Sequence, residues 1–173
     1  KRYRFIIVSR LDKNKNLLLP IKAFIKLNRT DCELLIVGNG PEKRNIENNI
    51  SHNNIKLIDK ATRNKMLKLL KNSNCIICSS LHETFGVGLL EAAYFGLPLI
   101  SSNCEGPSEI VNKTNGILLK KNRESHYLKA MNNIIINKKK FDPVKINKDI
   151  IARYGKLIYL RKFKKLSKNY TSK

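Results

Sequence analysis

The chain has 173 residues, of which 42% are hydrophobic, and it carries 35 Lys and Arg against 13 Asp and Glu, a formal net charge of +22. This length suits one domain with its own core, and this hydrophobic fraction excludes a wholly disordered chain. No apolar run approaches the roughly 20 residues of a membrane-spanning helix, and the first residues lead directly into a short strand-like run. We therefore expect neither a membrane span nor a secretory leader.

Short apolar runs alternate with helix-length amphipathic stretches. The apolar runs predict six strands, at residues 5–8, 34–37, 55–58, 75–78, 97–100 and 116–119. Between and after them, helical spacing predicts helices at residues 17–27, 41–46, 62–70, 87–95 and 124–136. Asn16 and Thr62 are the expected N-caps of two of these helices. Buried strands that alternate with helices predict an α/β fold, a Rossmann-like doubly wound parallel sheet of about six strands with helices on both faces.

The end of the chain differs in composition from the rest. Residues 138–173 contain 13 Lys or Arg against two Asp, and the last thirty residues predict one or two appended helices. We expect a domain over residues 1–145 and a basic helical extension over residues 146–173. Nucleic acid, an anionic membrane face and phosphorylated ligands could all bind a chain of this charge. We interpret most of the charge as a general compositional bias of the source.

Four cysteines occur, at Cys32, Cys75, Cys78 and Cys104. The spacing of Cys75 and Cys78 is that of a redox or zinc pair, but residues i and i+3 on a strand face opposite sides of the sheet. No second such pair and no nearby His pair completes a metal site. We therefore expect buried, reduced thiols in a cytoplasmic protein.

Polar and glycine-containing loops follow the predicted strands at the edge where a ligand binds in such sheets. Cations, glycine turns and helix N-termini at one edge predict a phosphate site, and two carboxylates suit the hydroxyls of a sugar. The residues concerned are, in chain order, Arg10, Lys15, Gly38, Gly40, Glu83, Gly86 and Glu91. Their joint occurrence at successive strand ends indicates a ligand with both a diphosphate and sugar rings.

Several of these segments resemble, in order, the motifs of the retaining group 1 glycosyltransferases, which have the GT-B fold. Residues 83–91 resemble the Glu-x7-Glu motif, and residues 92–100 resemble the run that follows it. Ser9-Arg10-Leu11 with Lys15 resembles the "GRL…K" loop, with Ser9 in place of the usual Gly. Further similar segments are residues 37–41 ("VGxGP"), residues 105–111 and residues 115–118; Thr84 replaces the usual Gly of the first motif.

The resemblance implies a role for each matching residue. Arg10 and Lys15 would hold the donor's diphosphate and stabilise the leaving group, and Glu83 would bind the hydroxyls of the transferred sugar. Glu91 would bind the ribose, which requires Glu83 to lie in the loop before the helix that carries Glu91. The remaining donor-binding positions are Gly38, Gly40, Phe85, Gly86 and Val87, and the base would lie near Ile58 and Lys60. The family uses no bound metal, and we expect no metal or cofactor.

The resemblance also implies a partner domain. GT-B enzymes have two such domains, and this chain begins one strand before the "GRL" loop, so we expect the amino-terminal acceptor domain to be absent and the fragment alone to be inactive. The basic residues 146–166 are the candidate for the family's final helix, which crosses to that domain. We expect a UDP-sugar rather than a GDP-sugar as donor, a bacterial surface-polysaccharide or lipid-linked acceptor, and a cytoplasmic location that includes the inner face of the membrane.

Two alternatives remain. A basic nucleic-acid-binding α/β module fits the charge, but aromatic residues make up only 7% of the chain, Trp is absent, and no RNA- or DNA-binding motif occurs. We therefore expect no nucleic acid as a partner. A related GT-B enzyme that is not a transferase, such as an epimerase or a phosphorylase, is disfavoured by the "GRL…K" loop.

Overall fold

A six-stranded parallel sheet lies at the centre of the computed structural model, which describes residues 2–50 and 52–156. The strands are β1 (Tyr3–Val8), β2 (Cys32–Val37), β3 (Ile55–Ile58), β4 (Cys75–Cys78), β5 (Leu99–Ser102) and β6 (Gly116–Leu119). Their order in the sheet is β3-β2-β1-β4-β5-β6, and every pairing is parallel. The chain order thus reverses direction between β1 and β4, which confirms the predicted Rossmann-like sheet.

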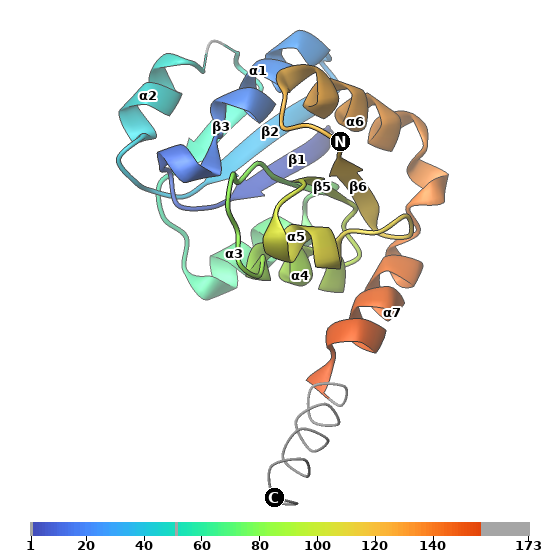
Figure 1. Ribbon diagram of the computed structural model, residues 1–173. Coiled ribbons are helices and arrows are strands. Elements are labelled where there is room, and N and C mark those ends of the chain that lie inside the picture. Colours follow the sequence, from blue (N-terminus) through green and yellow to red (C-terminus); the bar gives the residue numbers. More distant parts are fainter. Residues whose placement is uncertain (1, 51, 157–173) are drawn as a thin grey trace, which may run out of the picture.

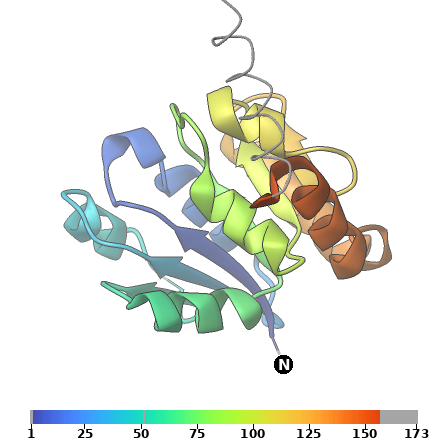
Figure 2. The same cartoon turned by 90° about the horizontal axis from the view of Figure 1, so that it is seen from below.

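Helices cover both faces of this sheet (Figures 1 and 2). They are α1 (Leu18–Leu27), α2 (Lys43–Asn48), α3 (Arg63–Lys71), α4 (Val87–Tyr94), α5 (Glu105–Ile110), α6 (Glu124–Ile136) and α7 (Pro143–Tyr154), with short 3-10 turns η1 (Lys13–Lys15) and η2 (Lys138–Lys140). Figure 1 shows α1 and α6 together on one face, with α3, α4 and α5 on the other. The two layers explain why the middle of β1 is an uninterrupted apolar run: Phe5, Ile6 and Ile7 are all buried.

The structure corrects three local expectations. Asn16 does not cap α1; it has a left-handed backbone and closes η1, and α1 follows Leu17 without a side-chain cap. The fifth strand begins at Leu99, because Pro98 precedes it and contributes only its carbonyl, which accepts from the Ile76 amide. Helix α5 was not expected at all. The predicted cap at Thr62 is confirmed, since its hydroxyl accepts from the Lys65 amide.

Helix α7 continues the folded domain beyond the expected boundary. It begins at Pro143, its N-cap Asp142 accepts from two backbone amides, and its side chains Ile146 and Ile150 are buried, with α4 as its packing partner. The expected division after residue 145 therefore falls inside one packed helix. The remainder of the expected extension, residues 157–173, lies outside the described residues. Among the residues that are described, no helix is long and apolar enough to cross a membrane.

Candidate functional site

A cavity of about 350 Å³ lies at the carboxyl ends of β1 and β4, where the order of the sheet reverses. This is the position at which an open α/β sheet binds ligands, because the loops after the two strands leave the sheet in opposite directions. The residues of the loop after β1, of the loop after β4 and of the start of α4 that line it are Ser9, Arg10, Lys15, Ser79, Ser80, Glu83, Gly86, Val87 and Gly88. Five predicted site residues, Arg10, Lys15, Glu83, Gly86 and Val87, thus meet in one cavity.

The centre of the site is an ion pair between Lys15 and Glu83. The Lys15 Nζ atom lies 2.7 Å from Glu83 Oε2, and the two side chains are only 19% and 24% exposed. The other carboxylate oxygen, Oε1, accepts from the Gly86 amide at 3.2 Å. The hydrogen bond from Lys15, helped by its charge and by the Gly86 and Phe85 amides, lowers the pKa of Glu83 although partial burial opposes this. Glu83 lies in the loop before α4, as the predicted pairing with Glu91 required.

The loops after β1 and β4 are joined by hydrogen bonds that hold this ion pair in place. Asn14 donates from Nδ2 to the His82 carbonyl at 2.8 Å and accepts from the His82 amide at 3.0 Å. Ser79 donates from Oγ to the Lys15 carbonyl at 2.6 Å. No local pattern in the sequence marks Asn14 or Ser79 as part of the site, because their partners lie more than sixty positions away.

The start of α4 supplies backbone donors to the same cavity. Gly86 precedes the helix with φ of 86°, a left-handed conformation that favours glycine. The amides of Val87 and Gly88 begin the helix, where backbone N–H groups have no intrahelical acceptor and the helix dipole is positive. Arg10 adds a second cation; its side chain is 73% exposed and lies 3.7 Å from Asp12. Phe85 is half exposed and its ring meets that of Tyr154. Cations and amides therefore converge on a space that suits an anion.

Gly38 and Gly40 support the site without lining the cavity. A Cβ atom at Gly38 would lie 1.8 Å from the Ser9 carbonyl oxygen, and one at Gly40 would lie 2.3 Å from that of Leu11. The Leu11 amide donates to the Asn39 carbonyl at 2.9 Å. The two glycines thus let the turn after β2 pack against the backbone that precedes Lys15.

Glu91 lies apart from Glu83. Its carboxylate pairs with the Arg63 guanidinium, and both residues line a second cavity of about 470 Å³ between α3, α4 and α7. The expected base-binding residues lie further along the sheet edge: the Ile58 carbonyl accepts from the Gly38 amide at 2.9 Å, and Lys60 is exposed. Neither of them lines the cavity at Lys15. Arg63 could not be predicted from the sequence, because its partner lies 28 positions away on another helix.

The cysteines and acidic residues form no metal centre in the described part of the chain. Cys32 and Cys75 are buried, and burial raises the pKa of both thiols. Cys78 and Cys104 are partly exposed, contrary to the expectation of four buried thiols, and all four are free. Within residues 2–50 and 52–156, no group of three or more His, Cys, Asp or Glu is arranged to hold a metal ion.

The chain is similar in sequence, and in fold, to known proteins. The model of the family "Glycosyl transferases group 1" matches residues 1–151. The chain is 32% identical over 114 residues to an uncharacterized glycosyltransferase of Methanocaldococcus jannaschii (62% of this chain, 28% of that protein). It is 26% identical over 131 residues to the human alpha-1,3/1,6-mannosyltransferase ALG2 (65% and 32%). The crystal structure of Anabaena HepE in complex with UDP and glucose has the same fold, with a TM-score of 0.84 at 19% identity, over 96% of this chain and 48% of that one. The chain spans less than half the length of each of these proteins.

Proposed function

The chain belongs to group 1 of the glycosyl transferases, and on that premise we propose that it is the donor-binding domain of a glycosyltransferase, which holds a nucleotide diphosphate sugar at the carboxyl ends of β1 and β4. The observation that carries the proposal is the cavity in which Lys15, Glu83 and the start of α4 meet. The UDP bound by the similarly folded Anabaena protein supports a UDP-sugar as the donor.

In the proposed complex, the diphosphate competes with Glu83 for the Lys15 ammonium group. Lys15, Arg10 and the amides at the start of α4 together stabilise the negative charge that grows on the leaving diphosphate. Glu83, released from Lys15, accepts hydrogen bonds from the hydroxyls of the sugar. Glu91 accepts those of the ribose after exchanging its contact with Arg63. Because two side-chain cations and a helix N-terminus supply the positive charge, we propose transfer without a metal ion. We propose retention at the sugar on the resemblance of the motifs to those of the retaining enzymes alone.

The acceptor and the cellular surroundings of the whole protein form a further part of this proposal. Because the chain spans less than half the length of these relatives, we propose that the acceptor binds to a second domain and that this chain alone binds the donor without transferring it. The basic composition of residues 138–173 supports an anionic membrane face as a neighbour and a lipid-linked or surface-polysaccharide acceptor in a bacterium.

Thermal unfolding with UDP, GDP, ADP and their sugar conjugates tests the proposal. A ligand at 100 times its dissociation constant stabilises the folded state by about 2.7 kcal/mol, or roughly 5–10 °C for a domain of this size. We expect such a shift with UDP and UDP-sugars, its loss in Lys15→Ala and Arg10→Ala, and its retention in the control Arg44→Ala, an exposed cation on α2.

The opposite result would favour the nucleic-acid-binding alternative. If no nucleotide shifts the transition and random oligonucleotides bind with a steep salt dependence, the donor-domain proposal is wrong. The same oligonucleotide titration with Lys15→Ala then shows whether the cavity takes part.

A further inference from the structure

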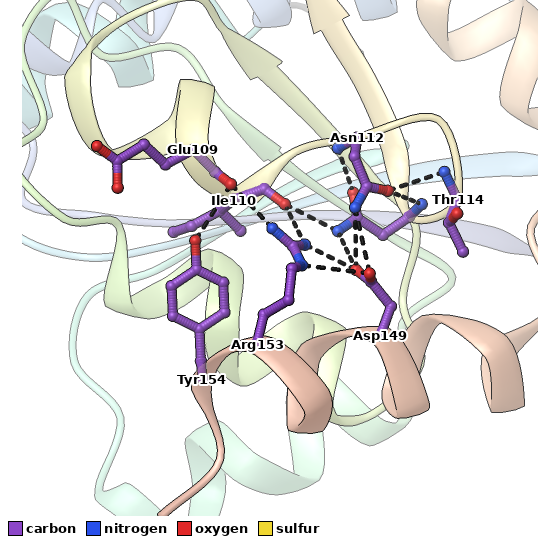
Figure 3. Close-up of polar contacts among 8 residues, drawn as sticks. Glu109, Ile110, Asn112, Thr114, Asp149, Arg153 and Tyr154 are labelled. Atoms are coloured by element: carbon purple, nitrogen blue, oxygen red, sulfur yellow. Dashed lines mark hydrogen bonds and ion pairs between the residues drawn. The ribbon is translucent and has the colours of Figure 1, made fainter. Parts of the chain in front are cut away.

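The last turn of α7 is attached to the end of α5 by side chains (Figure 3). Arg153 donates from Nη1 to the Glu109 carbonyl at 2.9 Å and from Nη2 to the Ile110 carbonyl at 2.7 Å, and the Tyr154 hydroxyl donates to the Glu109 carbonyl at 3.1 Å. These carbonyls lie at the end of α5 and accept no hydrogen bond from within the helix. The negative end of the helix dipole also favours a cation there.

Asp149 fixes the guanidinium of Arg153 in this position. Its carboxylate accepts from Arg153 Nη2 at 2.7 Å and from Nε at 3.2 Å, and it also accepts from Nδ2 of Asn112 and of Asn115, each at 3.1 Å. Asn115 is fully buried and donates in addition to the Ile110 carbonyl. Figure 3 shows Asp149 at the centre of these contacts, between α7 and the loop that precedes β6. We call Asp149, Arg153 and Tyr154 the α7 latch.

Helix α5, which the latch holds, supports the loop that carries Glu83. The Gly106 amide donates to the Glu83 carbonyl at 2.8 Å, and Glu105 Oε2 accepts from the Glu83 amide at 3.3 Å. A Cβ atom at Gly106 would lie 2.5 Å from the Phe85 Cα atom, so the two backbones are in contact. A displacement of α5 therefore displaces Glu83 and the residues up to Gly86.

The latch also contacts this loop directly. The Tyr154 ring meets the Phe85 ring edge-on, with centroids 6.4 Å apart and planes at 75°. The Arg153 guanidinium lies 5.1 Å from the centroid of the same Tyr154 ring, a second contact that restrains the ring. Two routes, one through α5 and one through Phe85, thus connect the end of α7 to the donor loop.

We propose that Arg153 and Tyr154 are positioning residues for the donor site, which act by holding residues 83–86 in the geometry that binds the sugar. The inference rests on the proposed function for its effect on binding, but the latch itself acts without a ligand. Loss of the latch frees the loop, so that Glu83 and the Gly86 amide no longer meet at 3.2 Å.

Hydrogen exchange on the ligand-free 173-residue chain tests the latch alone. Arg153→Lys keeps the charge but loses the paired contacts of the guanidinium. Its matched control is Arg4→Lys, because Arg4 also pairs with a carboxylate (Glu33, 2.8 Å) and approaches a backbone carbonyl, at the opposite end of the strands. We expect the Gly86 and Gly106 amides to exchange at least about tenfold faster in Arg153→Lys, with no such change in Arg4→Lys. Equal rates in the two variants would overturn the proposal.

Calorimetric titration with UDP-glucose and with UDP then tests positioning, at a temperature where every variant is folded. Arg153→Lys should weaken UDP-glucose binding by on the order of 3- to 10-fold relative to Arg4→Lys, and UDP binding less, since Glu83 faces the sugar. In a Glu83→Ala background the effect of Arg153→Lys on UDP-glucose should shrink to its effect on UDP, because the side chain proposed to hold the sugar is gone.

The two experiments separate failure of the latch from failure of the proposed function. If the wild-type chain binds no nucleotide sugar but Gly86 exchange responds to Arg153→Lys, the donor-site proposal fails and the latch stands as a structural link. If binding is intact and Arg153→Lys lowers only the unfolding temperature, the latch stabilises the fold without positioning the site, and the inference is wrong.

Discussion

Glu83 faces Lys15 at 2.7 Å, and this contact controls how the carboxylate titrates. Because the pKa of Glu83 in the folded state lies below its ordinary value of 4.5, the folded state releases the proton more readily than the unfolded state does. The stability that the pair contributes is therefore present above about pH 4.5 and is lost as the pH falls through the lowered pKa.

Replacement of the cation tests this directly. In Lys15→Met the pKa of Glu83 should rise toward 4.5, because the first cause of its lowering is removed. Carbon-13 NMR of the side-chain carboxyl measures it. The control is Asp31, whose pKa is lowered to about 2 by its own hydrogen bond from Arg29, and which should titrate unchanged. A Glu83 pKa that does not move would mean that the ion pair does not persist in solution.

The hydroxyl of Ser9 is a second feature at this scale. Its Oγ atom is buried and has no hydrogen-bond partner among the described residues. Burial of an unsatisfied polar group costs about 1–3 kcal/mol, so Ser9→Ala should raise the free energy of unfolding. The matched change Ser102→Ala should lower it, because the Ser102 hydroxyl donates to the Ser80 carbonyl at 2.6 Å. Urea denaturation of both variants gives the comparison, and destabilisation by Ser9→Ala would contradict it.

The sequence predicted the site residues that belong to motifs and missed those that hold them. Lys15 and Glu83 were predicted to share a site, since parallel strands bring their following loops to one edge. The contact of Asn14 with His82 depends on the tertiary arrangement of two loops. A polar residue in one loop does not indicate which distant residue it will contact. The separation of Glu91 from the cavity likewise follows from the helical turn that α4 makes after Val87.

At the scale of elements, the central strands were predictable because helices cover both of their faces, and each contains a run of buried apolar residues such as residues 5–7 of β1. Helix α5 was not, because Gly106 and Pro107 are typical of a turn. Both residues nevertheless lie in its first turn. Proline is tolerated there, because backbone N–H groups of the first turn donate to no carbonyl of the helix. The close approach to Phe85, which only glycine permits, is a tertiary requirement that a short segment of sequence does not reveal.

Replacement by alanine should change the stability of the fold in opposite directions at Gly38 and Gly88. Gly38→Ala places a Cβ atom 1.8 Å from the Ser9 carbonyl and should destabilise the fold by more than about 2 kcal/mol. Gly88 lies in α4, where a Cβ atom meets only the Val8 carbonyl at 4.0 Å. Gly88→Ala should therefore stabilise the fold by up to about 1 kcal/mol, the difference in helix propensity. Thermal unfolding distinguishes the two, and a lower transition temperature for Gly88→Ala would refute the second prediction.

At the scale of the whole molecule, the net charge of +22 opposes the compact state. Salt screens this repulsion over a Debye length of about 10 Å at 0.1 M. The urea midpoint should therefore rise between 0.01 M and 0.2 M salt with an unchanged slope. NaCl and KCl at equal ionic strength serve as the control, since screening depends on concentration and not on the cation. A midpoint that falls with added salt would show that favourable ion pairs outweigh the repulsion.

The extent of the domain could not be taken from composition. The lysine-rich composition near the end of the chain led us to expect an extension over residues 146–173, yet Ile146 and Ile150 bury one side of α7 within the domain. Their spacing of four is that of a helix face, but such a face does not say which surface covers it. Here α4 covers it, and the contacts of Asp149 and Arg153 complete the attachment.

The reversal of strand order between β1 and β4 has a consequence for how the chain is made. Of the six strands, β1 leaves the ribosome first, and β2 covers one of its edges soon afterwards. Its other edge pairs with β4, which is synthesised about 70 residues later. At the usual rate of synthesis this edge is unpaired for roughly 4 to 14 seconds. During that interval a half-built sheet presents an apolar, unpaired strand edge, the kind of surface to which other chains add. The topology that opens the cavity at Lys15 thus also gives the nascent chain an aggregation-prone intermediate.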